Sequence, residues 1–62
     1  MTLIKSKNLP DQDSAYAKII AAHKGLTEAE SAALNARLIL ILVNHIGNEG
    51  VLAEALDLAK TA

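Results

Sequence analysis

Three polar residues stand beside the most apolar stretch of the chain: Arg37 precedes the run 38–43, and Asn44 and His45 follow it. On a helix, Arg37 and Asn44 lie two turns apart on one face. A guanidinium and a side-chain amide on one face could bind a small anion or a carboxylate, with His45 as a third donor. Alternatively, Arg37 pairs with an acidic side chain of a neighbouring helix and Asn44 fixes the register of an oligomer, since both residue types are common at interfaces.

The two histidines raise the question of a metal site. His23 and His45 lie near the C-terminal ends of two successive predicted helices. If these helices form an antiparallel hairpin, the histidines lie at opposite ends of it, roughly 25 Å apart by helix rise. Neither histidine belongs to a pair spaced four residues apart, and the chain has no cysteine. The sequence therefore predicts no metal site, and His23 is more simply a cation favoured near a helix C-terminus.

No combination of residues forms a recognisable catalytic group. Ser6, Ser14 and Ser31 stand outside nucleophile motifs, and the glycines form no phosphate-binding loop. Neighbouring carboxylates such as Asp11 and Asp13 are expected to face solvent, so nothing tunes them for proton transfer. We therefore expect no catalytic residue, no cofactor and no enzymatic activity.

The elements that would position these residues are three helices after an N-terminal arm. A proline disfavours helical geometry at the residue before it, and Pro10 therefore predicts an extended arm over residues 1–10, followed by a single helical domain over residues 11–62. The first helix is expected to begin at the N-cap Asp11 and to end near Lys24. The glycine that follows is expected in the left-handed C′ position.

The middle helix has the clearest start. Thr27 and Glu30 form a capping box, in which each side chain accepts the other residue's backbone N–H. The helix then runs to Ile46, before Gly47, a length of roughly 28 Å. Asn48 can cap a third helix that ends near position 60. The short connections predict that successive helices pack roughly antiparallel.

Apolar residues repeat with helical spacing in the two outer helices and predict their buried faces. The stripe of the first helix consists of Ala15, Tyr16, Ile19, Ile20 and Ala22. The stripe of the third helix consists of Val51, Leu52, Ala55, Leu56 and Ala59.

The run 38–43 is apolar at six consecutive positions, which point in every direction around a helix and must be covered on all sides. A chain of 62 residues with no cysteine and a single aromatic residue, Tyr16, has little material to cover it. We therefore predict an all-α, three-helix protomer with a long apolar central helix, assembling into a homo-oligomeric helical bundle, a dimer or higher. The predicted interface residues are Leu38, Leu40, Ile41 and Val43.

Charge and length argue against two classes of partner. The net charge is −1, and the third helix carries Glu49, Glu54 and Asp57 against Lys60, which would repel phosphate. The apolar run is shorter than the roughly 20 residues of a membrane span. We expect neither nucleic acid nor membrane as a partner, and a cytoplasmic location.

Several motifs together resemble a known family. These are LNARLILILVNHIG at 34–47, LTEAES at 26–31, NLPD at 8–11, and Tyr16. They are similar to a small bacterial family of helical proteins catalogued as a domain of unknown function, and the resemblance spans nearly the whole chain. It implies no activity, cofactor or catalytic residue. Such proteins resemble accessory partners of oxidoreductases, a role that attaches to no position in this sequence.

Two functions follow as expectations. The first is a non-enzymatic helical oligomerisation or interaction module, docking on a larger protein such as an enzyme. The alternative is a binder of a small anion or carboxylate at the oligomer interface, using Arg37, Asn44 and His45.

Overall fold

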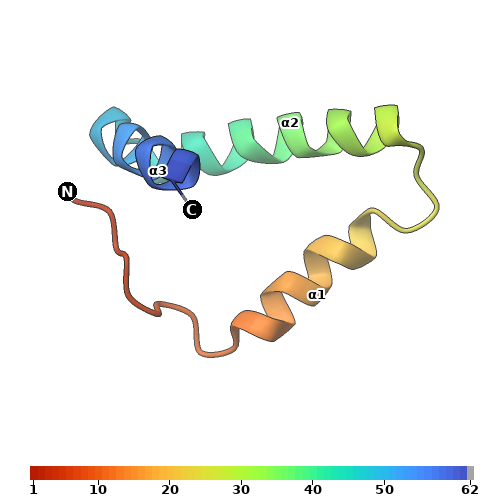
Figure 1. The fold of residues 1–62 in the computed structure, drawn as a ribbon, viewed down its shortest axis with the longest axis horizontal. Coiled ribbons are helices and arrows are strands. Elements are labelled where there is room, and N and C mark those ends of the chain that lie inside the picture. Colours follow the sequence, from red (N-terminus) through yellow and green to blue (C-terminus); the bar gives the residue numbers. More distant parts are fainter. Residues whose placement is uncertain (62) are drawn as a thin grey trace.

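The structure is a computed structural model that describes residues 1–61, and within them it contains three α-helices and no strand. The helices are α1 (Gln12–Ala22), α2 (Glu28–Ile46) and α3 (Glu49–Thr61) (Figure 1). The predicted all-α protomer with a long central helix is thus confirmed. The last position of the predicted helical domain, Ala62, lies outside the described residues.

Helix α1 begins as predicted and ends earlier. The Asp11 side chain accepts the Ser14 N–H at 3.0 Å and caps the helix. At the other end, the amides of His23 and Lys24 bond to carbonyls three residues back, which tightens the chain into a turn before the expected end at Lys24. Gly25 has a φ of +80°, the left-handed geometry expected of it, one position beyond C′.

The predicted ends of α2 are confirmed. The Thr27 N–H donates to Glu30 Oε1 at 2.9 Å, and the Glu30 N–H donates to Thr27 Oγ1 at 3.2 Å, so the capping box is complete. Gly47 ends the helix at a φ of +63°, where a side chain would be strained. Asn48 Oδ1 then accepts the Val51 N–H at 2.9 Å and starts α3.

The three helices and the arm form an open ring. Helix α1 diverges from α2 at the 23–27 connection, α3 lies across the C-terminal end of α2, and residues 1–11 return toward α3 (Figure 1). Within residues 1–61, no two helices pack along their length. The predicted antiparallel packing is therefore wrong. The short connections set the directions of the helices, but no layer of interdigitating side chains draws them together.

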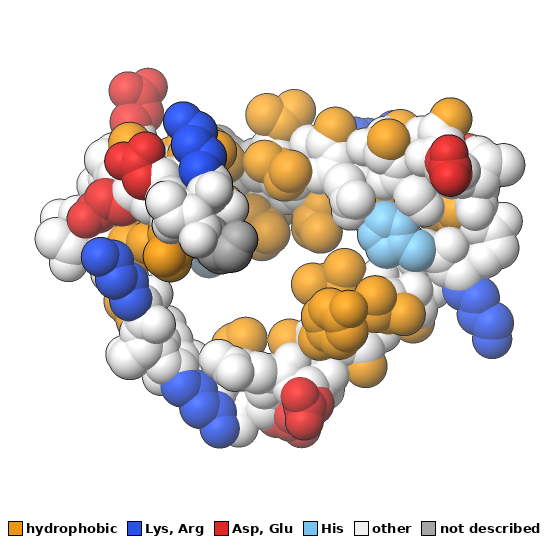
Figure 2. Space-filling view, in the orientation of Figure 1, with side chains coloured by type: hydrophobic (Ala, Val, Ile, Leu, Met, Phe, Trp, Pro, Cys, Tyr) orange, Lys and Arg blue, Asp and Glu red, His pale blue; other side chains and the backbone are white. Residues whose placement is uncertain are grey.

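Hydrogen bonds between side chains and between a side chain and the backbone join neighbouring parts of the ring at two places. At the first, His23 Nδ1 and Ser31 Oγ share a hydrogen bond of 2.9 Å, which joins the end of α1 to the first turn of α2. At the second, the Leu3 N–H donates to Glu54 Oε2 at 3.0 Å and joins the arm to α3. The space-filling view shows an opening through the middle of the molecule, with hydrophobic side chains around it (Figure 2).

The ring has almost no core. Val51, 4% exposed, is the one buried residue among residues 1–61. The chain exposes 5409 Å² of surface, whereas a compact folded protein of 6.5 kDa is expected to expose roughly 3,800 Å². The excess is about 1,600 Å². Much of the apolar surface that would form a core is therefore left uncovered by the chain itself.

Candidate functional site: an apolar groove between α1 and α2

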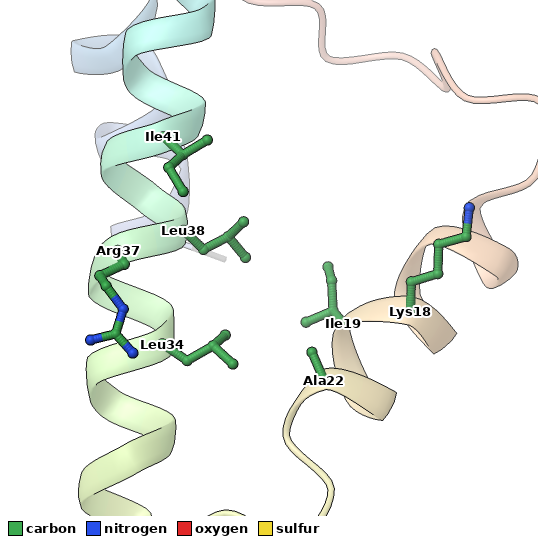
Figure 3. A pocket seen from close by; sticks show the side chains of 7 residues that line it. All are labelled: Lys18, Ile19, Ala22, Leu34, Arg37, Leu38 and Ile41. Atoms are coloured by element: carbon green, nitrogen blue, oxygen red, sulfur yellow. The ribbon is translucent and has the colours of Figure 1, made fainter.

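The space between α1 and α2 forms a groove of about 570 Å³. Its lining is Lys18, Ile19, Ala22, Leu34, Arg37, Leu38 and Ile41. In the close view, the three apolar side chains of α2 point toward α1, and the two of α1 point toward α2 (Figure 3). Both faces of the groove are therefore apolar.

Local sequence places these side chains. Leu34, Leu38 and Ile41 follow one another at spacings of four and three residues, so the geometry of the helix puts them on one face. Ile19 and Ala22 share a face of α1 for the same reason. The capping box fixes where α2 begins, and the turn before it sets the direction of α2 relative to α1.

The groove continues toward the N-terminal arm. A second hollow of about 580 Å³ shares Lys18, Ile19 and Leu38 with the first. It adds side chains from the arm and from the two helices, namely Leu9, Pro10, Asp11, Ser14, Ala15 and Leu42. The inner side of the ring is thus a continuous, mostly apolar surface, with hydrophobic side chains around the central opening (Figure 2).

Two cations stand at the edge of the groove, Arg37 on α2 and Lys18 on α1. The Arg37 side chain extends along α2, and the Lys18 ammonium points away from Leu34 and Leu38 (Figure 3). Both residues are exposed. The arrangement can hold an apolar group between the helices, with positive charge at the rim.

The structure separates the three polar residues singled out from the sequence. Arg37 lines the groove, whereas Asn44 and His45 do not. Both are exposed on the last turns of α2. The three are therefore not gathered around one space, and their role in ligand binding stays a prediction.

The four predicted interface residues are distributed around α2. Leu38 and Val43 are half-buried, whereas Leu40 and Ile41 are 68% and 64% exposed. Leu38 and Ile41 face the groove, and Leu40 and Val43 lie outside it. The chain itself leaves both sides of the helix with large apolar side chains in contact with solvent.

Sequence reasoning missed the pairing of His23 with Ser31. Both side chains are half-buried at the corner between α1 and α2. A histidine and a serine eight residues apart, on either side of a glycine turn, are the only hint that the sequence offers. The residues that the structure describes hold no group of three or more histidine, cysteine or acidic side chains able to bind a metal ion. The contact that the structure shows for the His23 ring is its hydrogen bond to Ser31, which links the two helices at this corner.

Comparison with known proteins shows the family to which the chain belongs. Among the described helices, none has the length and apolar character needed to cross a membrane. No curated protein and no solved structure matches the chain. A family model described as "Protein of unknown function (DUF2783)" matches residues 3–61. The resemblance found in the motifs is thus confirmed, and the chain belongs to the DUF2783 family of proteins of unknown function.

Proposed function

We propose that this protein is a non-enzymatic helical interaction module that completes its core by binding a second copy of itself. The observation that carries the proposal is the burial of a single residue, Val51, among residues 1–61. The chain also exposes about 1,600 Å² more than a compact protein of its mass. A typical stable interface buries about 800 Å² on each partner. The excess surface is therefore sufficient for an extensive self-association.

The energetics favour assembly over a folded monomer. Each large aliphatic side chain left in water forgoes roughly 1.5–3 kcal/mol of burial. On the side of α2 turned away from the groove, Leu40 and Ile39 are 68% and 57% exposed. A domain this small has only a few kcal/mol of net stability. Covering these side chains in a dimer supplies what the single chain lacks.

Sedimentation equilibrium, combined with circular dichroism over a range of protein concentrations, tests the proposal. We expect a particle of at least twice the 6.5 kDa chain mass at micromolar concentration. The unfolding temperature is expected to rise with protein concentration, because assembly stabilises the folded state by mass action. A helical monomer whose unfolding temperature is independent of concentration would overturn the proposal.

We further propose that the assembled module works in the cytoplasm and docks on a larger protein. The apolar groove between α1 and α2 supports docking, because it offers a concave hydrophobic surface with cations at its rim. Purification of a tagged chain from its source organism tests docking. A larger protein recovered with the wild type and lost with Leu38→Asp is the expected result. Equal recovery with both chains would count against the groove.

A second candidate function is the binding of a small carboxylate with an apolar tail. Arg37 and Lys18 at the rim of the groove favour it, since both can pair with a carboxylate. Isothermal titration with decanoate tests it, with Arg37→Gln and Lys18→Gln as variants. Saturable binding that both variants weaken would support the candidate. Binding that is absent or unchanged in the variants would leave only the interaction module.

A further inference from the structure

The side of α2 turned away from the groove has its own apolar pattern. Residues 29, 33, 36, 40 and 43 repeat at alternating spacings of four and three, which is the heptad spacing of a coiled-coil seam. With about 100° of rotation per residue, this line lies about 140° around the helix from the groove face. We call it the seam; its residues are Ala29, Ala33, Ala36, Leu40 and Val43.

Size changes halfway along the seam. Its first three positions are alanine, and its last two are leucine and valine. The flank on one side follows the same rule, because Ala32 precedes Ile39 and Ile46. The N-terminal half of this face is therefore shallow and the C-terminal half protrudes. In the protruding half, Leu40 and the flanking Ile39 are 68% and 57% exposed, and Val43 is half-buried.

A gradient of this kind favours one way of pairing two copies. In a parallel pair, alanine would face alanine at one end and leucine would face leucine at the other, which leaves a void and forces the helices to splay. In an antiparallel pair, each protruding half meets a shallow half. Large residues opposite small ones allow the close packing found in protein interiors.

We propose that the protein self-associates through the seam, with the two α2 helices antiparallel. Ala36 of each copy faces Leu40 of the other, and Ala33 faces Val43. This inference rests on the proposed function, since it names the surface and orientation of the self-association proposed there. Antiparallel pairing also sets the opposite ends of the two helix dipoles side by side, which is electrostatically favourable.

The amount of exposed surface is consistent with this assignment. The excess of about 1,600 Å² is twice the roughly 800 Å² that each partner contributes to a standard interface. Because none of the seam residues lines the groove, pairing along the seam would leave the groove free. The groove and the seam are separate surfaces on one helix.

Disulfide trapping tests the orientation. The chain has no cysteine, so engineered thiols report on their own positions. In the proposed register, Ala33→Cys and Val43→Cys each lie about 15 Å along the axis from their own equivalent in the other copy, at 1.5 Å per residue. That separation is too large for a disulfide, which needs Cα atoms within about 7 Å.

Each single variant is therefore expected to stay uncrosslinked under oxidation. A mixture of the two, after subunit exchange, is expected to give covalent heterodimers containing up to half of the chains. Crosslinking of each single variant with itself would overturn the proposal in favour of a parallel pair. A dimer that yields no crosslink in the mixture would place self-association on another face. In both cases the proposed function stands, whereas a monomer in sedimentation would remove both.

A size exchange gives a second, independent test. Ala36→Leu is expected to weaken dimerisation by about tenfold or more, because the new side chain meets Leu40 of the other copy and overpacks the seam. Leu40→Ala added to the same chain is expected to restore most of the lost affinity, since the leucine at position 36 then faces an alanine at position 40 of the other copy. Ala36→Leu that strengthens the dimer would contradict antiparallel pairing, because only a parallel pair has a void at that position.

Discussion

The two faces of α2 differ in what the chain provides for them. On the groove face, Leu34 and Leu38 are half-buried opposite α1. On the seam, Leu40 is 68% exposed and Ala29 and Ala36 are also exposed, whereas Ala33 and Val43 are half-buried. On the groove side, α2 lies opposite another helix of its own chain, whereas the largest side chain of the seam, Leu40, extends into solvent. We therefore expect substitutions on the two faces to differ in how their effects depend on protein concentration.

The largest effect is expected from Leu40→Asp. In the dimer, this change places an unpaired carboxylate in an apolar interface, at a cost of about 3–5 kcal/mol. Dissociation and loss of helical circular dichroism are expected together at micromolar concentration. Ile20→Asp is the matched control, because Ile20 is 52% exposed on α1 and lines neither hollow of the groove. A folded dimer of the Leu40 variant would remove the distinction between the two faces.

A smaller effect of a different kind is expected from Leu38→Ala. Leu38 belongs to the groove face and is half-buried, so its truncation lowers the free energy of unfolding by about 1–3 kcal/mol. The dissociation constant of the dimer, measured by sedimentation, is expected to stay within a few-fold of the wild type. A large increase in that constant would show that the groove face belongs to the dimer interface as well.

Thr27→Ala tests a contribution that depends on neither face. It removes the hydroxyl that accepts the Glu30 N–H, and loss of such a cap costs about 1 kcal/mol. Thermal unfolding at fixed concentration measures the effect. Thr27→Ser is the control, because it keeps the acceptor, and the serine variant is expected to unfold close to the wild-type temperature.

The smallest effect is expected at the corner between α1 and α2. A double-mutant cycle with His23→Ala and Ser31→Ala measures the coupling between the two side chains, which share a hydrogen bond of 2.9 Å. A coupling energy of about 0.5–1.5 kcal/mol is expected. A coupling near zero would mean that the corner is held by the backbone turn alone.

The ends of α1 and α2 differ in how well the sequence predicts them. Thr27, Glu30 and Gly47 act through bonds within a few residues, so the ends of α2 could be predicted from the sequence alone. The end of α1 could not, because a tight turn at His23 competes with a further helical turn. The residue types at this position do not indicate whether the chain continues as an α-helix or tightens into the turn.

Burial was predicted less well than secondary structure. The helical stripes were expected to be covered, yet Tyr16, Ile20 and Leu56 are 66%, 52% and 51% exposed. Periodicity identifies which residues share a face, but it does not identify what lies opposite. Val51 is buried as predicted. Ala15, Leu52 and Ala55 are half-buried, and the other stripe residues are exposed.

Only one residue of the predicted ligand-binding group lies at the candidate site, because the sequence does not show which element lies opposite a helix face. Arg37 lies at the rim of the groove, whereas Asn44 and His45 lie away from it. Their grouping in the sequence came from their place on one helix. The groove depends on where α1 is placed by the turn at His23 and Gly25, and its position is set by tertiary geometry.

The near-absence of a core has a consequence for the life of the protein in a cell. Because Val51 is the one buried residue among residues 1–61, we expect a newly made, unassembled chain to be readily cleaved by proteases. Marginally stable chains are continuously removed by such quality control. Copies made in excess of what assembles would be degraded. If the chain self-associates as proposed, its cellular level is expected to depend on assembly as well as on synthesis.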